Sequence, residues 1–279
     1  MGKLMGFIQI IRPLNCVMMG FAVIVGASLV STLNFTPNLF LGFATSFALT
    51  AASMVINDFY DRKIDAINEP NRPIPRGDIS PKQALIFAFA LSLTGFVAAF
   101  KTNLPSLMAA VGAWIISITY ITKGKGTGLP GNFLVSATVV MPFIYGGLSV
   151  GQLESSTLLF VAIVFFSNTA REVTKGIVDV EGDRSHKIRT IAVTHGEKAA
   201  AIVATIFSFL AVCLSPLPWM LGLVSDLFVP PVIVTDLGLI VSSVLLLQDY
   251  SRTNAKKIKN LNLVWFVTGL VAFILGTIT

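Results

Sequence analysis

Asn57–Arg76 reads NDFYDRKIDAINEPNRPIPR and directly follows about twenty mostly apolar residues. Four acids and four bases therefore stand at the end of a segment long enough to cross the hydrocarbon of a membrane as a helix. If that helix continues into the charged stretch, Asn57, Asp61 and Asp65 share one face, because they are spaced four residues apart. Asp58 lies one residue round from this face.

These carboxylates have the spacing of a metal site. Acids that crowd one face of a helix repel each other unless a cation lies between them. Mg²⁺ binds proteins through one or two carboxylates and leaves positions for water and for a substrate phosphate. Asn57, Asp58, Asp61 and Asp65 are therefore candidate metal ligands. The alternative is a hydrated helix end whose charges are offset by neighbours four residues away.

The composition indicates an all-α polytopic membrane protein, since 54% of the 279 residues are hydrophobic and 12% are charged. Nine apolar runs are long enough to span a bilayer as helices. They cover residues 14–33, 38–57, 82–100, 105–122, 133–150, 154–176, 198–214, 222–248 and 260–278. Pro230 and Pro231 are expected to bend or delay the eighth helix.

Basic residues predict the orientation. With the N-terminus in the cytoplasm, 19 of the 20 Lys and Arg residues fall on the cytoplasmic side and Lys101 alone falls outside. We expect a multi-pass protein of the cell membrane whose N-terminus and site face the cytoplasm. The net charge of +6 is then explained by topology and indicates no nucleic-acid partner. Nothing in the sequence indicates a protein partner.

The two cysteines, Cys16 and Cys213, lie in separate spans and are expected to be core residues.

A second charged stretch, residues 168–189, reads NTAREVTKGIVDVEGDRSHKIR at the end of the sixth span. The side chains on one helical face are Asn168, Arg171, Glu172, Lys175 and Asp179. Asp183 follows Asp179 by four residues, so both can reach one ion. Charges so near hydrocarbon normally face a water-filled cavity or each other, so a structural ion-pair cluster is the alternative here.

The two stretches resemble each other. Asp61-x-x-x-Asp65 is followed by Arg72-Pro73-Ile74, and Asp179-x-x-x-Asp183 is followed by Arg189-Thr190-Ile191. Each stretch follows the second helix of a four-helix set, which predicts one domain, 1–279, with pseudo-repeat halves at about 1–125 and 126–250 and a ninth helix. Such repeats place their sites between the halves. We therefore expect two facing acid clusters in a central cavity that opens to the cytoplasm.

These motifs carry a family resemblance. NDFYDRKID fits the pattern NDxxDxxxD and DVEGD fits DxxxD, so the chain resembles the UbiA superfamily of intramembrane prenyltransferases. The flanking residues Asn68, Pro70, 72–75 and 131–132 agree with it, as do the nine spans. The short, very apolar chain is most similar to the archaeal members that prenylate geranylgeranylglyceryl phosphate. It departs from many relatives in one loop, which has a tyrosine four residues before a lysine in those proteins but Tyr120, Lys123 and Lys125 here.

The resemblance implies transfer of a geranylgeranyl group from its diphosphate, the isoprenoid donor, to the hydroxyl of a lipid-like acceptor in archaeal ether-lipid biosynthesis. The acceptor implied is geranylgeranylglyceryl phosphate, and diphosphate is released with the help of Mg²⁺. The implied metal ligands are Asn57, Asp58, Asp61, Asp65, Asp179 and Asp183. The implied catalytic residues are Asp61, Asp65, Asp179 and Asp183. The implied substrate-binding residues are Asn68, Arg72, Tyr120, Lys123, Lys125, Arg171, Lys175, Lys187 and Arg189.

Three alternatives stay open from the sequence alone. A prenyltransferase of this kind could act on an aromatic acceptor such as 4-hydroxybenzoate. A CDP-alcohol phosphatidyltransferase also holds Mg²⁺ at a membrane edge, but the DGxxAR segment it requires is missing from the sequence. A transporter could use paired acids, although acids beside bases suit a diphosphate better than a cation.

We also expect Asp61 and Asp183 to lie at a hydrated rim, and Asp236 to face protein or a cavity instead of lipid.

Overall fold

The structure is a computed structural model that describes residues 2–31, 36–151 and 153–278, and every regular element in these ranges is helical. Eight helices of the described ranges are long and apolar enough to span a membrane, and the bent pair α1 and α2, counted as one broken span, gives a ninth. The elements are α1 (Lys3–Ile10), α2 (Pro13–Ser28), α3 (Pro37–Asn68), α4 (Pro81–Thr102), α5 (Leu104–Thr122), η1 (Gly124–Thr127), α6 (Leu129–Ser149), α7 (Ser155–Val178), α8 (Val180–Ser185), α9 (Ile191–His195), α10 (Glu197–Leu214), α11 (Leu217–Met220), η2 (Asp226–Phe228), α12 (Val229–Gln248) and α13 (Arg252–Gly276).

The first span is bent by 42° between α1 and α2. Arg12 at the bend has a left-handed backbone with a φ of 51°, and Pro13 opens α2. Proline lacks the N–H that a continuous helix would need at this position, so the helix breaks immediately before Pro13. The predicted span at 14–33 matches α2 up to Ser28, while residues 32–33 lie outside the described part of the chain.

Helix α3 confirms that the second span continues into the charged stretch. Its 32 residues run from Pro37 to Asn68, which at 1.5 Å per residue corresponds to about 48 Å. About 30 Å is enough to cross the hydrocarbon. The excess length carries the first acid motif beyond the apolar part of the helix.

The end of α7 and the start of α12 are set by local backbone structure. Helix α7 stops at Val178, and Asp179 separates it from the short α8. The eighth predicted span is delayed, not bent, because α12 starts at Val229 and its two prolines lie in the first turn. The N–H groups of a first turn have no partner within the helix, so prolines are tolerated there.

Close helix contact at the centre of the bundle joins α2 to α6. A Cβ on Gly26 would lie 2.0 Å from the carbonyl oxygen of Phe143, and a Cβ on Gly146 would lie 2.1 Å from that of Val23. The two backbones can approach only because both positions are glycine, as in many membrane helix pairs. Elsewhere α3 packs on α4 and α7 packs on α10. The separation of α2 and α6 is therefore set by these two glycines.

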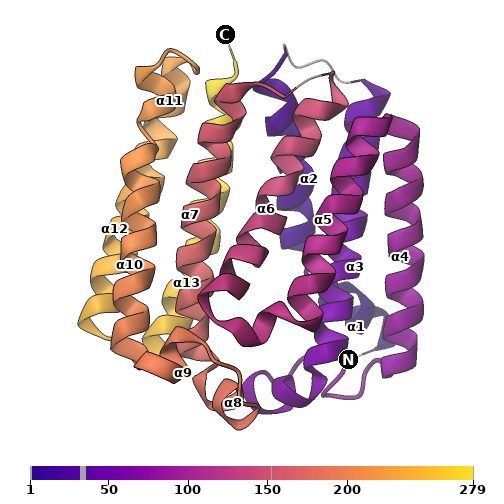
Figure 1. Ribbon diagram of the computed structural model, residues 1–279, viewed down its shortest axis with the longest axis vertical. Coiled ribbons are helices and arrows are strands. Elements are labelled where there is room, and N and C mark those ends of the chain that lie inside the picture. Colours follow the sequence, from indigo (N-terminus) through magenta and orange to yellow (C-terminus); the bar gives the residue numbers. More distant parts are fainter. Residues whose placement is uncertain (1, 32–35, 152, 279) are drawn as a thin grey trace.

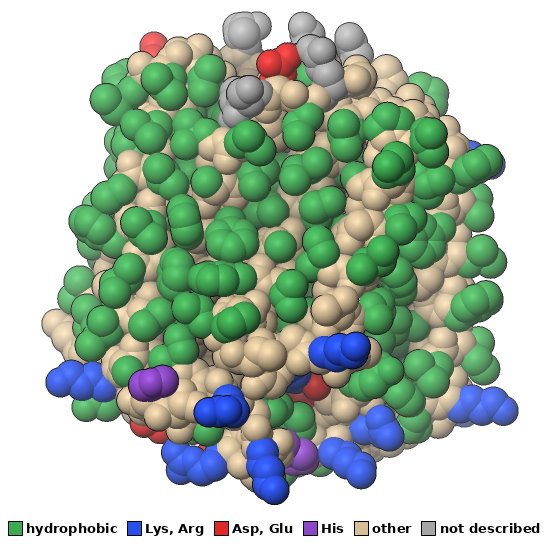
Figure 2. All heavy atoms as spheres, in the orientation of Figure 1, with side chains coloured by type: hydrophobic (Ala, Val, Ile, Leu, Met, Phe, Trp, Pro, Cys, Tyr) green, Lys and Arg blue, Asp and Glu red, His purple; other side chains and the backbone are tan. Residues whose placement is uncertain are grey.

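The chain is a multi-pass integral membrane protein, and its charged residues gather at one end. Figure 1 shows that the N-terminal helix lies at the lower end with α8 and α9, whereas α13 finishes at the upper end. Figure 2 shows Lys and Arg side chains concentrated along the lower edge, below a broad band of hydrophobic side chains. We call this lower end, with α8, α9 and the chain after α3, the motif end.

The two cysteines differ in their exposure. Cys16 is buried as expected, but Cys213 is exposed, so the expectation that both are core residues is wrong for Cys213.

Candidate active site

The acids of the first motif lie on the last three turns of α3. Asp58, Asp61 and Asp65 are 2%, 4% and 4% exposed, and Asp183 of the second motif is 4% exposed. The expectation that Asp61 and Asp183 lie at a hydrated rim is therefore wrong for their side chains. Neighbouring segments cover them, which removes water and strengthens every charge interaction at these groups.

Basic side chains from three separate segments pair with the first motif. Arg72 contacts Asp65 at 2.5 Å and Asp58 at 3.2 Å. Lys125 of η1 forms an ion pair with Asp61, whose carboxylate also accepts a hydrogen bond from Asn57 Nδ2 at 2.9 Å. Buried charges persist only when they are paired, so these contacts explain how three buried aspartates can be packed close together.

Arg12 is a site residue that the sequence analysis missed. Its Nη2 lies 2.5 Å from Asp58 Oδ1, so the bend between α1 and α2 brings a base from the start of the chain to the first motif. The signal that could have revealed it is a base immediately before Pro13 at the start of an apolar run. A charge at that boundary has to face a polar partner.

The second motif lies against the end of α3. Asn68 Nδ2 donates to the carbonyl of Asp179 at 3.3 Å, and Asn68 Oδ1 accepts from the N–H of Gly182 at 3.1 Å. A Cβ on Gly182 would lie 2.4 Å from Asn68 Nδ2, so only glycine allows this approach. The structure thus brings the two motifs together, and it commits the amide of Asn68 to joining them.

The charges of the two motifs act on each other. Burial and, after it, the neighbouring Asp179 raise the pKa of Asp183 to about 7. Lys125 and Lys175 oppose this rise, and Asp61 of the other motif contributes to it. Burial alone would lower the pKa of Arg72, but Asp58 and the other nearby acids outweigh it and hold that pKa above its usual value. Asp61 of the first motif and Lys125 beside it thus influence the ionisation of Asp183 in the second motif.

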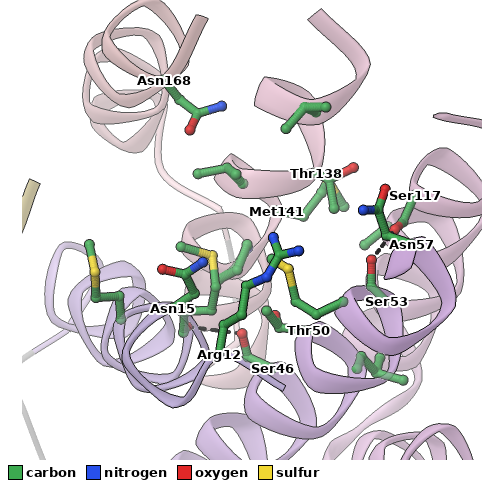
Figure 3. A pocket seen from close by; sticks show the side chains of 18 of the residues that line it. Arg12, Asn15, Ser46, Thr50, Ser53, Asn57, Ser117, Thr138, Met141 and Asn168 are labelled. Carbon is green, nitrogen blue, oxygen red and sulfur yellow. Dashed lines mark hydrogen bonds between the residues drawn. The ribbon is translucent and has the colours of Figure 1, made fainter. Parts of the chain in front are cut away.

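A cavity of about 560 Å³ opens beside the motifs and runs between the helices. Its wall combines apolar side chains with hydroxyl and amide groups, and Figure 3 shows Arg12 pointing into it among them. Ser46, Thr50, Ser53 and Asn57 recur every three or four residues along α3, so one face of that helix supplies a polar stripe. Ser53 and Ser117 share a hydrogen bond of 2.6 Å across the wall.

Helix α7 contributes a charged group to the same cavity. Buried Glu172 lies 3.1 Å from Arg171 and 3.7 Å from Lys175. These three side chains line the cavity together with Asn168, as their shared helical face predicts. Tyr120 of α5 also lines it. Acids and bases thus line the cavity, but none of the aspartates of the two motifs is among its lining residues. The structure therefore does not show the expected placement of both acid clusters in the cavity itself.

A pattern for the UbiA prenyltransferase family matches residues 19–274. The chain belongs to the UbiA prenyltransferase family. It is 36% identical over 275 residues to digeranylgeranylglyceryl phosphate synthase of Archaeoglobus fulgidus, which covers 96% of this chain and 94% of that protein. A solved structure from work on digeranylgeranylglyceryl phosphate synthase in membranes superimposes with a TM-score of 0.75 at 30% identity, covering 100% of this chain and 99% of that one. A UbiA homologue of A. fulgidus bound to GPP and Mg²⁺ shares the fold, with a TM-score of 0.68 at 17% identity and coverage of 96% and 99%.

Three other residues of this UbiA family member that were predicted to bind substrate neither line the cavity nor contact an acid of the motifs. The side chains of Lys123, Lys187 and Arg189 are exposed, and none of the three is among the residues that line the cavity. Lys125, in contrast, reaches Asp61 from the loop in which the chain departs from many relatives. The structure therefore selects Lys125 over Lys123 as the base of that loop nearest the motifs.

The donor atoms at the motif end suit Mg²⁺. Among residues 2–31, 36–151 and 153–278, no three His, Cys, Asp or Glu side chains lie close enough together to form a complete metal site. Mg²⁺ needs no such site, because it commonly takes one or two carboxylates and completes its shell with water and substrate phosphate. The high pKa of Asp183 results from burial and crowded acids, a combination that a dication relieves. The residues present therefore fit a metal that arrives with a phosphorylated substrate.

Proposed function

We propose that this UbiA family member transfers a geranylgeranyl group from geranylgeranyl diphosphate to the hydroxyl of geranylgeranylglyceryl phosphate and releases diphosphate. The observation that carries the proposal is the direct contact between the two acid motifs, through Asn68 and Gly182, in a membrane-spanning bundle whose cavity is lined by Asn57 and Arg72 of the first charged stretch. The near full-length similarity to digeranylgeranylglyceryl phosphate synthases supports this choice of substrates.

The diphosphate would be bound at the motif end. Mg²⁺, held by carboxylates among Asp61, Asp65, Asp179 and Asp183, would supply neutralising charge for the leaving diphosphate. Arg72 and Lys125 now pair with acids of the first motif, so they are already placed to exchange those partners for phosphate oxygens. Charge-assisted hydrogen bonds of this kind are short and strong, and they favour the departing diphosphate.

The prenyl chain would occupy the cavity. Thr45 and Asn57 lie twelve positions apart and both line the cavity. The cavity therefore follows α3 for about 18 Å, at 1.5 Å per residue. Met18, Trp114 and Phe266 are among its apolar lining residues. A water-poor chamber of this kind protects an electron-deficient allylic carbon from hydrolysis once the bond from carbon to oxygen lengthens.

The acceptor would lie against the polar part of the wall. Geranylgeranylglyceryl phosphate combines a prenyl chain with a glycerol unit and a phosphate, so it needs apolar, hydrogen-bonding and positively charged contacts together. The stripe of Ser46, Thr50 and Ser53 supplies hydroxyl groups, and Arg171 and Lys175 supply positive charge to the cavity wall. A cavity for a hydrocarbon chain alone would need none of these groups.

The assay that tests the function uses purified protein, Mg²⁺ and geranylgeranyl diphosphate with one of two acceptors, geranylgeranylglyceryl phosphate or 4-hydroxybenzoate. We expect the mass of the doubly prenylated glyceryl phosphate and an equal amount of released diphosphate. Product from the aromatic acid but not from the glyceryl ether would overturn the acceptor and leave prenyl transfer standing. Absence of diphosphate release with either acceptor would overturn the enzyme assignment itself.

A further inference from the structure

The guanidinium of Arg252, at the start of α13, contacts the segments that carry both acid motifs. Its Nε donates to the carbonyl of Val178 at 3.1 Å, and its Nη1 donates to Glu181 Oε2 at 3.1 Å. Its Nη2 donates to the carbonyl of Asn68 at 3.4 Å. One side chain thus joins the last residue of α3, the last residue of α7 and the first turn of α8.

Helix ends explain why a base is stabilised at this point. The last carbonyls of a helix have no partner within the helix, and they carry partial negative charge. Val178 and Asn68 are the final residues of α7 and α3, so Arg252 satisfies one such carbonyl from each helix. Arginine is suited to this contact, because its planar group presents several donors in a fixed arrangement that lysine cannot reproduce.

The rest of α13 keeps Arg252 in place. Ser251 caps the helix by accepting a hydrogen bond from the N–H of Asn254 at 3.4 Å. Lys256 and Lys259, four and seven residues after Arg252, lie on the same helical face and approach Glu69 at 3.7 Å and 3.9 Å. The basic face of α13 is therefore docked on the end of α3.

We propose that Arg252 is a positioning residue that fixes the end of α3 against the junction of α7 and α8, and so sets the separation of the two acid motifs. The inference rests on the proposed function in one respect, namely that both motifs serve one Mg²⁺-bound diphosphate. Arg252 itself contacts backbone carbonyls and Glu181, and it is not among the residues that line the cavity. Its effect on the reaction is exerted through the aspartates.

The first test measures geometry without any turnover. Spin labels on Ala66→Cys and Arg184→Cys, both exposed positions, report the distance from α3 to α8 in a background with Cys16→Ser and Cys213→Ser. We expect a single narrow distance distribution in the parent and a broadened one in Arg252→Met. Lys257→Met, an exposed base on the same helix, is the matched control and should leave the distribution unchanged.

The second test measures metal dependence. Removing a residue that supports metal ligands typically costs about 10- to 100-fold in metal affinity or activity, so the Mg²⁺ concentration for half-maximal rate should rise by about that factor in Arg252→Met. The melting temperature of the same samples identifies any general loss of fold. Arg252→Lys keeps the charge without the three-way contact, so it should broaden the label distribution too, and it replaces Arg252→Met if that variant does not fold.

An unchanged label distribution in Arg252→Met would overturn the proposal, whatever the activity. A distribution fully restored by Arg252→Lys would also overturn it, because charge alone would then suffice. Since the label measurement needs neither substrate nor metal, its failure is distinct from failure of the proposed reaction.

Discussion

Asn68 accepts a hydrogen bond of 3.1 Å from the backbone N–H of Gly182, which links the end of the first acid motif to the middle of the second across 114 residues of sequence. The same amide donates to Asp179, the first aspartate of the second motif, at 3.3 Å. The two motifs are therefore joined by hydrogen bonds from the Asn68 side chain to the backbone of the second motif. This coupling leads to the first prediction.

Gly182→Ala should separate the motifs. The added Cβ would lie 2.4 Å from Asn68 Nδ2, so α8 or the asparagine must move. Overpacking of this kind costs about 1–3 kcal/mol, and we expect a lower melting temperature together with a sharply reduced prenyl transfer rate. Gly112→Ala on α5 is the matched control, because a Cβ there meets no atom within 4 Å. Equal activity in the two variants would contradict the role assigned to the contact.

Asp61→Asn and Asp183→Asn should each abolish Mg²⁺-dependent turnover. Both side chains are buried, and the amide removes the charge while keeping the shape. Asp78→Asn is the control: Asp78 pairs with Arg76, outside both motifs, and the pKa of its carboxyl is held below its usual value by that partner. Rates are compared over a range of Mg²⁺ concentrations, and wild-type turnover in either motif variant would defeat the model of two cooperating acid clusters.

Lys125→Met should reduce the rate far more than Lys123→Met. Lys125 pairs with Asp61, whereas the side chain of Lys123 is exposed two residues earlier in the same loop. Loss of one positioned group that stabilises developing negative charge typically costs about 100-fold or more in turnover. The comparison needs the kcat and KM for geranylgeranyl diphosphate in both variants. A larger defect in Lys123→Met would mean that the loop rearranges when substrate binds.

Asp236→Asn should leave both fold and turnover intact. Asp236 accepts a hydrogen bond of 2.6 Å from Ser215 Oγ and is not among the residues that line the cavity. An asparagine oxygen can accept the same bond, so the contact between the chain at Ser215 and α12 survives. The measurement is the melting temperature beside the transfer rate, and a stable but inactive variant would assign Asp236 a part in catalysis.

Local sequence patterns predicted the helices well, because each span is set by its own run of apolar residues. The long-range features were harder to predict. The burial of Asp61 depends on a loop more than sixty residues away that supplies Lys125, and the role of Arg12 depends on a bend in the first span. The contacts of Arg252 join segments up to 184 residues apart. No spacing within one segment carries that information, whereas the acids themselves were found because helical periodicity places them on one face.

The final prediction concerns orientation, for which we propose that the motif end faces the cytoplasm. Single cysteines are placed at Lys187 in the chain after α8 and at Lys101 at the far end of α4, both exposed, in a background without Cys16 and the exposed Cys213. An impermeant thiol reagent added to sealed cells should label Lys101→Cys and spare Lys187→Cys until the membrane is opened. The physical reason is the excess of Lys and Arg at the motif end, which is retained on the cytoplasmic side during insertion. Labelling of Lys187→Cys in sealed cells would reverse the orientation and place the diphosphate site outside.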